Sequence, residues 1–254
     1  KEFVFKEKYF DGAGKFDIIR QEKRYGKQAD ILLLYAKMDE SGKHKKAAKK
    51  INKYIGNHIL NYAHPKSNRS KFDDHHDFLQ DFIERYKKME STYKGSARNL
   101  PLWENEHRLI LDYNNHHVVV FEFVEVIFEG GAYPESTINY VNFNLQTGDK
   151  FALSDILTSG YEAKLNELGE KLFRETYGFK DIKSFAEEGI NFKDDKFSLN
   201  DNFAISKGGL LFRFNQNEIA PHFLGSFEIF IPYSQVLDLI KKDSPLNTIV
   251  KNHY

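Results

Sequence analysis

The stretch that most constrains the fold of this chain is LLFRFNQNEIAPHFLGSFEIFIPY, which runs from Leu210 to Tyr233. Two short runs within it, 210–214 and 227–231, alternate apolar with polar residues, and such alternation predicts strands that bury one face. The segment 215–225 between them is too long for a tight turn. Pro221 restricts its backbone, and Gly225 gives the backbone conformational freedom at its end. We therefore expect two neighbouring antiparallel strands joined by a structured loop.

The rest of the chain alternates between strand and helix patterns. Apolar runs predict strands at 30–36, 109–113, 118–128 and 138–145, and a hairpin at 203–214. Apolar residues at helical spacing predict helices at 43–60 and from Ser70 to about residue 93. Another helix is expected behind the capping-box pair Ser159 and Glu162, and a last one is expected to be capped by Ser234.

This order of elements predicts an α+β fold. We expect two α/β subdomains with mostly antiparallel sheet and helices packed on one face. The boundary is placed after residue 128, which gives an N-terminal domain of residues 1–128 and a C-terminal domain of residues 129–254.

Composition excludes several classes of function. The 254 residues carry no net charge, so the molecule lacks the basic surface typical of a nucleic-acid binder. Without cysteine there is no disulfide, thiolate nucleophile or cysteine zinc site. Residues 1–70 are basic and the remainder is acidic, which fits either ordinary solvated faces or regions that mate with a partner. The lysines of the 43–60 helix likewise form either a solvent face or a patch for an anionic group.

Familiar catalytic motifs are missing. The motifs GxSxG, GxxxxGK[ST] and HExxH do not occur. Asp73, His76 and Asp77 share a helix face that offers three ligands to a divalent ion, but acids also favour the first turn of a helix electrostatically. A carboxylate pair that acts on a glycan cannot be located from sequence spacing. We expect no catalytic residue, no metal site and no cofactor.

Two loops offer candidate ligand-binding residues. In the first, the paired glycines predict a sharp turn, which is either purely structural or lets the backbone approach a ligand closely while a tyrosine ring stacks on it. In the second, Glu218 is placed either to hydrogen-bond a sugar or peptide, or to accept backbone N–H groups of its own loop. Trp103 is the aromatic residue that we expect to be exposed. The candidate ligand-binding residues are Gly130, Gly131, Tyr133, Asn217, Glu218, His222 and Tyr233.

Four segments carry a family resemblance: FEGGAYP at 128–134, NFNLQTGDKFALSDIL at 142–157, GLLFRFNQNEIAPHFLG at 209–225 and IPYSQV at 231–236. In this order they resemble the extracytoplasmic domain shared by RsiV-type anti-sigma factors and the N-terminal part of PdaC-type peptidoglycan deacetylases. The first half is similar to the companion domain, through Tyr35-Ala36-Lys37-Met38 and a helix that contains Asn52 and Ile55. The resemblance covers roughly residues 30–240.

The chain departs from the family pattern at four positions. Tyr133 stands where the family usually has histidine, Asn217 and His222 stand where it usually has tyrosine, and Ala36 stands where proline is common. If these side chains contact a ligand, the departures imply a different ligand. The histidines of this chain assemble no metal triad, so the deacetylase activity is not carried over.

The resemblance implies a place in the cell envelope, in the periplasm or at the cell surface, as a lipoprotein whose anchor lies outside this sequence. It also implies recognition of a cell-wall-related partner, which for the RsiV-type protein is lysozyme. We therefore expect a non-enzymatic envelope binding or sensing domain for a peptidoglycan fragment or a wall-active protein. Two alternatives stay open: a cell-wall glycan hydrolase with a carboxylate pair, and a protein–protein assembly domain.

Overall fold

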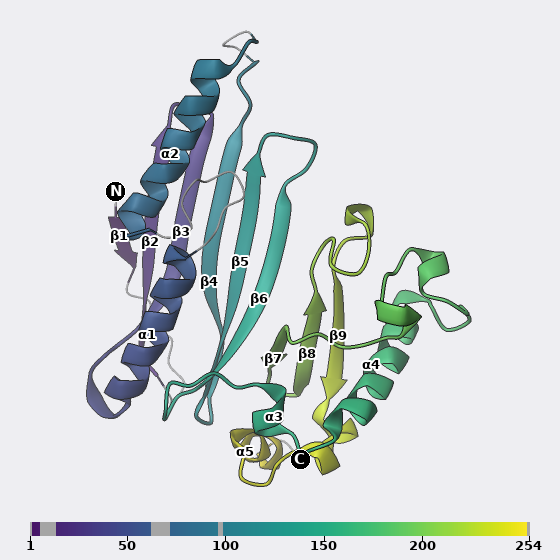
Figure 1. Cartoon of the computed structure of the whole chain (residues 1–254). Coiled ribbons are helices and arrows are strands. Elements are labelled where there is room, and N and C mark those ends of the chain that lie inside the picture. The colour runs from purple at the N-terminus through teal and green to yellow at the C-terminus, as the bar shows by residue number, and fades with distance from the viewer. Residues whose placement is uncertain (1, 6–13, 62–71, 96–98, 253–254) are drawn as a thin grey trace.

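The structure, a computed structural model, describes residues 2–5, 14–61, 72–95 and 99–252 (Figure 1). In this part of the chain, two sheets and the helices packed on them give an α+β fold, which confirms the predicted class. The larger sheet takes its strands in chain order: β1 (Glu2–Phe5), β2 (Phe16–Tyr25), β3 (Ala29–Met38), β4 (Trp103–Asn115), β5 (Val118–Glu129) and β6 (Glu135–Asn144). The smaller sheet comprises β7 (Phe203–Ile205), β8 (Gly209–Phe214) and β9 (Phe227–Pro232).

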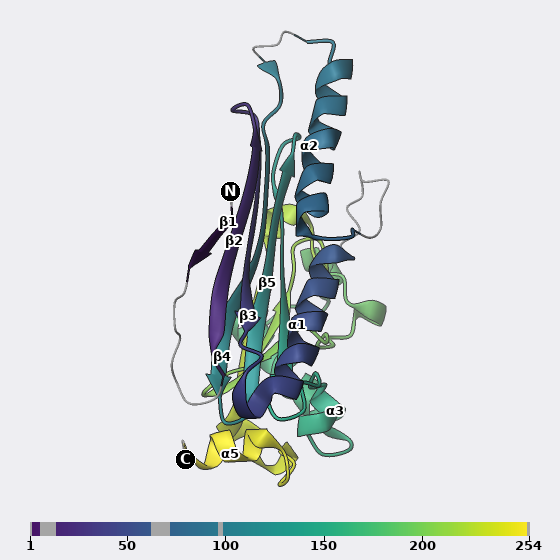
Figure 2. The same ribbon diagram turned by 90° about the vertical axis from the view of Figure 1, so that its left-hand side faces the viewer.

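The larger sheet is antiparallel except between β3 and β4. These two strands run parallel because the chain between them forms a crossover of two helices, α1 (Lys45–Leu60) and α2 (His75–Thr92). Both helices cover the same face of the sheet (Figure 2). The buried residues of α1 repeat at the predicted helical spacing and are Ala47, Ala48, Ile51, Ile55 and Ile59.

The start of α2 is built by aspartates. The Asp74 carboxylate accepts the backbone N–H of Asp77 at 2.8 Å, and the Asp77 carboxylate accepts that of Asp73 at 3.1 Å. These bonds satisfy N–H groups that a helix start leaves open, so Asp74 is the N-cap. The predicted cap, Ser70, lies outside the described residues.

Around the smaller sheet, the hairpin expected at 203–214 is present as β7 and β8, and β8 pairs antiparallel with β9. Helix α4 (Tyr161–Tyr177) packs along β9, where the rings of Phe173 and Phe227 lie 5.4 Å apart. Two shorter helices, α3 (Leu153–Ile156) and α5 (Pro245–Lys251), complete this half.

Two helix starts differ from the prediction. The N-cap of α4 is Gly160 at φ +82°, and no side chain caps it, so the predicted capping box of Ser159 is wrong. A left-handed glycine turns the chain into this helix instead. Ser234 lies in a 3-10 turn, Tyr233–Gln235, and not at the start of an α-helix, because Val236 at φ −132° interrupts the helical path.

In the described part of the chain the apolar residues form two cores, and β5 contributes to both. Because successive side chains of a strand point to opposite faces, Val119 and Phe121 join the core under α1 and α2. Val118 and Val120 join the core of the smaller sheet. The boundary predicted after residue 128 falls inside β5, and β6 continues the larger sheet beyond it.

Candidate functional site

Two of the candidate loops meet in space. Segment 130–134 joins β5 to β6 and segment 215–225 joins β8 to β9, at the same end of the molecule in Figure 1. The rings of Tyr133 and His222 stack, with centroids 5.4 Å apart and an angle of 26° between their planes. We call these two segments the paired loops. The sequence singled out both residues, and the structure places them in contact.

The first of the paired loops leaves an anchored strand end. Gly130 and Gly131 have φ angles of +77° and +123°, a left-handed backbone that favours glycine and makes the predicted sharp turn. Both carboxylate oxygens of the preceding residue, Glu129, lie 2.7 Å from a guanidinium nitrogen of Arg85 on α2. Asn105 of β4 donates to the same buried carboxylate at 2.9 Å. The turn is therefore fixed to the larger sheet and its helix.

The second of the paired loops is held in shape by Glu218. Its Oε2 accepts the backbone N–H of Asn215 at 2.7 Å, and its Oε1 accepts the side-chain amide of Asn200 at 2.7 Å. The neighbouring Asn217 has a φ of +63°, a conformation that asparagine tolerates better than most residues. Glu218 therefore accepts a backbone N–H group of its own loop, which is one of the two roles that the sequence predicts for it.

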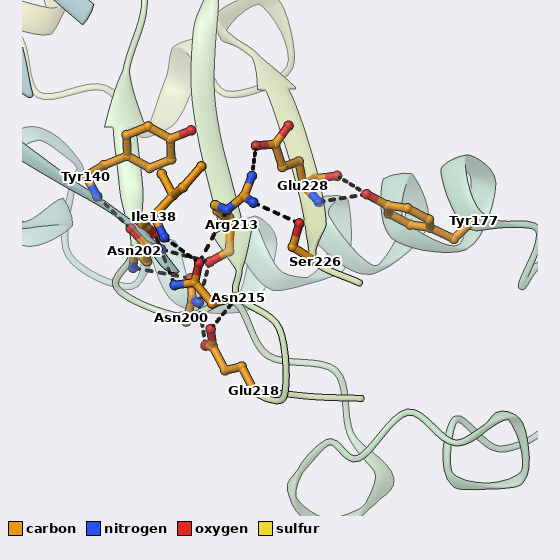
Figure 3. A network of polar contacts seen from close by, with 10 residues as sticks. All are labelled: Ile138, Tyr140, Tyr177, Asn200, Asn202, Arg213, Asn215, Glu218, Ser226 and Glu228. Atoms are coloured by element: carbon orange, nitrogen blue, oxygen red, sulfur yellow. Dashed lines mark hydrogen bonds and ion pairs between the residues drawn. The ribbon is translucent and has the colours of Figure 1, made fainter. Parts of the chain in front are cut away.

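Asparagine side chains join the second loop to the edge strand β6 (Figure 3). Asn215 accepts the backbone N–H of Ile138 at 2.8 Å and donates to its carbonyl at 3.0 Å. Asn202 accepts the N–H of Tyr140 at 2.8 Å and also donates to the Ile138 carbonyl at 2.8 Å. These amides cover backbone groups that an edge strand leaves unpaired.

Asn142 completes the junction from the other side. Its side chain is buried, donates to the carbonyl of Phe203 at 2.7 Å and accepts the N–H of Ile205 at 2.7 Å. The smaller sheet is thus tied to β6 at both ends, and the paired loops are positioned relative to each other. Sequence reasoning missed this role of asparagine; the available signal is the set Asn200, Asn202 and Asn215 around one hairpin.

The paired loops present an aromatic surface. Tyr133 is 71% exposed and Phe223 is 82% exposed, with Leu224 beside it 39% exposed. Nε2 of His222 is enclosed and has no hydrogen-bond partner among the described residues. Exposed rings on anchored loops can stack on sugar faces or fill pockets on a protein partner.

Ionisable side chains gather where the two sheets adjoin. Arg213 of β8 pairs with Glu228 of β9 (Figure 3). Burial, followed by the nearby Asp112 carboxylate, raises the pKa of Glu122, and burial raises the pKa of Asp112. Burial, followed by the Glu122 charge, raises the pKa of Tyr140 to about 12. Carboxylates with raised pKa values hold a proton closer to neutral pH, which is what a general acid requires.

Two residues that the sequence singled out, one as a candidate ligand contact and one as an exposed aromatic, are buried. Tyr233 is fully buried and donates its hydroxyl hydrogen to the carbonyl of Ser206 at 2.8 Å, which makes it part of the core. Trp103 is only 4% exposed and packs edge-on against Tyr86 of α2, so its expected exposure is wrong. The physical reason is that β4 begins at Trp103 and directs this side chain under the helix.

The metal and membrane features below concern residues 2–5, 14–61, 72–95 and 99–252. No group of three or more metal-ligating side chains occurs in these ranges, and Asp77, one of three proposed ligands, is engaged at the start of α2. No helix in the same ranges is both long and apolar enough to span a membrane.

Part of the chain is similar to a known family, and most of the chain is similar in fold to solved structures. Residues 154–234 match the model of DUF3298, described as a protein of unknown function. A crystal structure of a DUF3298 family member from Bacteroides fragilis NCTC 9343 is similar, with a TM-score of 0.69 and 18% identity over 94% of this chain and 98% of that one. A DUF3298 family protein from Pseudomonas aeruginosa PAO1 gives a TM-score of 0.65 and 14% identity over 93% and 97%. Curated proteins give no significant match.

Proposed function

Since residues 154–234 match the model of a family of unknown function, we propose a function from the geometry of the paired loops. The chain is a non-catalytic binding or sensing module of the bacterial cell envelope that recognises a peptidoglycan fragment or a wall-active protein such as lysozyme. The observation that supports binding is the ring of Tyr133 stacked on His222 beside the exposed Phe223. Large exposed rings are characteristic of interaction sites when their supports are rigid.

The rigidity of the supports favours binding over accidental exposure. Glu129 ties one loop to α2, and Glu218 and Asn215 tie the other to the smaller sheet and to β6. A preorganised surface loses little conformational entropy when a partner binds. The location in the envelope and the anchored state come from the resemblance to the RsiV-type and PdaC-type domains, and they stay part of the proposal.

Binding should be tested on two partners with the same variants. Purified peptidoglycan is used in a pull-down and lysozyme in a calorimetric titration, with Tyr133→Ala, Phe223→Ala and the control Leu237→Ala. Leu237 is 48% exposed and lies outside the paired loops. Either loop variant should weaken binding about tenfold or more, as expected for aromatic hot spots, and the control should not. If the unaltered chain binds neither partner, the proposal fails in this form.

Glu218 separates a ligand contact from a structural role. Because its carboxylate bridges Asn215 and Asn200, Glu218→Ala should lower Tm together with binding. Loss of binding at unchanged Tm would instead mean that Glu218 contacts the ligand directly.

The carboxylates near the sheet junction favour a second candidate function, a glycan hydrolase. Asp112 and Glu122 both have raised pKa values, and the Asp112 charge contributes to the raised pKa of Glu122. A hydrolase would release reducing ends from peptidoglycan and lose this activity in Glu122→Gln, although the Tm of the variant is no lower than that of the unaltered chain. The absence of release from the unaltered chain would eliminate this candidate.

A further inference from the structure

A cavity of about 400 Å³ lies between the end of β3 and the middle of α1, with His75 of α2 at its border. Its volume is within the range of sites that hold small organic ligands. The cavity is on the α1 side of the larger sheet, whereas the paired loops connect β5 to β6 and β8 to β9 (Figure 1). It is therefore a separate site, and nothing in the proposed function uses it.

Positive charge dominates the lining. Lys37 of β3 and Lys49 and Lys53 of α1 line the cavity, against a single carboxylate from Glu40. Lys49 and Lys53 are four residues apart and share one helix face. In the described part of the chain none of these three lysines has an ion-pair partner, whereas the neighbouring Lys50 pairs with a carboxylate at 2.6 Å. Three like charges around one cavity favour an anionic occupant.

A glycine keeps the cavity open. Gly56 lies inside α1 and lines the cavity, and a Cβ built on it meets no atom within 4 Å. Glycine in a helix interior is destabilising relative to alanine, and it is usually tolerated where another element packs closely. Here no close packing requires it. What it leaves is open space on the helix face that carries Lys49 and Lys53.

The remaining wall is polar and fixed. The Asn52 side chain bonds both the N–H and the carbonyl of Met38 at 2.8 Å, which locks the end of β3 to α1. It also donates to Glu40 at 3.0 Å, so this carboxylate is oriented at the cavity border. The Tyr35 ring meets His75 edge-on at 4.8 Å and supplies an aromatic side to the lining.

We infer that this cavity binds a small acidic sugar, a saccharide that carries a carboxylate or a phosphate. The lysines neutralise the acidic group, the oriented Glu40 accepts hydroxyl hydrogens, and the Tyr35 ring faces the sugar ring. A neutral sugar would leave the lysine charges uncompensated. An inorganic anion would leave most of the volume and the aromatic side unused.

Two matched pairs of probes test this inference by isothermal titration. N-acetylmuramic acid is compared with N-acetylglucosamine, which lacks the lactyl carboxylate, and glucose 6-phosphate is compared with glucose; inorganic phosphate is the fifth probe. At least one acidic sugar should bind about tenfold more tightly than its neutral counterpart, a difference of about 1.4 kcal/mol. Which pair shows the difference identifies the acidic group as carboxylate or phosphate.

Variants on one helix locate the site. The double variant K49Q/K53Q should weaken binding of the acidic sugar about tenfold. The double variant K45Q/K46Q removes the same charge from exposed positions outside the cavity and should change it less than about twofold. Gly56→Leu fills the space and should abolish binding while Tm stays at or above that of the unaltered chain.

Three results would overturn the inference. These are equal binding of acidic and neutral sugars, equal binding of inorganic phosphate, and equal effects of the two double variants. Tyr133→Ala should leave acidic-sugar binding unchanged, so a failure at the paired loops and a failure at this cavity are distinguished.

Discussion

Of the single side-chain truncations at the junction between the two sheets, Asn142→Ala should lower the free energy of unfolding the most. The wild-type side chain satisfies two buried backbone groups, the carbonyl of Phe203 and the N–H of Ile205, each at 2.7 Å. Alanine leaves both groups without their partner. An unsatisfied buried group costs about 1–3 kcal/mol, so the free energy of unfolding should fall by about 2–6 kcal/mol.

This loss is a large fraction of the 5–15 kcal/mol that typically stabilises a folded chain. At about 2–4 °C per kcal/mol for a chain of this length, a loss of about 3 kcal/mol lowers Tm by about 6–12 °C. Urea and thermal unfolding measure it. The control is Asn144→Ala, because Asn144 caps the N–H groups of Gln146 and Thr147 in an exposed turn, and its loss should cost about 1 kcal/mol.

The variant Asn142→Asp tests the direction in which stability changes with pH. The carboxyl keeps the shape and, when protonated, both hydrogen bonds; when ionised, it faces the Phe203 carbonyl in a buried site, so its pKa should be raised. A raised pKa in the folded state gives stability that is complete below the ordinary value of about 3.9 and is lost as pH rises through the raised value. Equal stability of Asn142→Ala and Asn144→Ala, or greater stability of Asn142→Asp at neutral than at acid pH, would refute this account of the junction.

Three further predictions address single contacts. Glu129→Gln should lower the free energy of unfolding by about 2–3 kcal/mol in urea, because it breaks a buried pair with Arg85, and an effect no larger than that of the exposed-pair variant Asp149→Asn would contradict this. Glu122 has a raised pKa, so Glu122→Gln should gain Tm over the unaltered chain only as pH rises above 4.5; a gain that is largest at acid pH would be the wrong sign. Asn217→Val should cost about 1–2 kcal/mol at its φ of +63° while Asn217→Gly should not, and equal Tm values would show that the loop does not hold this backbone.

The fold class and most elements could be predicted because they depend on local periodicity. The spacing of Ile51, Ile55 and Ile59 along α1 is one example, and alternation along β8 and β9 is another. The burial of Trp103 could not be predicted, because the loop signal of the nearby Pro101 says nothing about which helix covers the first residue of β4. The last helix was misplaced because 3-10 turns and α-helices share the same short-range pattern around Ser234.

The candidate site could be predicted only in its parts. Glycines and a lone tyrosine mark one loop, and an irregular polar segment marks the other, so Tyr133 and His222 were found separately. Their contact depends on side-chain amides that join Asn202 and Asn215 to β6, more than fifty residues away in the chain. No sequence periodicity reports such a contact, since the asparagine spacing follows neither a strand nor a helix.

The domain boundary can be tested by cutting the chain where the sequence placed it. A fragment of residues 129–254 loses Val118 and Val120, which are fully buried in the core of the smaller sheet. It also removes the β5 residues that pair with β6. This pairing begins with Val118 opposite Asn144 and ends with Ile127 opposite Glu135. Burying a valine contributes about 1.5–3 kcal/mol, so the two valines alone account for about 3–6 kcal/mol.

That loss is comparable with the whole stability of a domain, so fragment 129–254 should unfold without a cooperative transition and show poorly dispersed amide signals. A fragment of residues 99–254, which retains β4, β5 and β6, is the matched comparison and should keep more native structure. If fragment 129–254 instead unfolds cooperatively with the Tm of the full chain, the second core does not depend on β5. The paired loops would then be carried by an independent C-terminal domain, as the sequence alone had indicated.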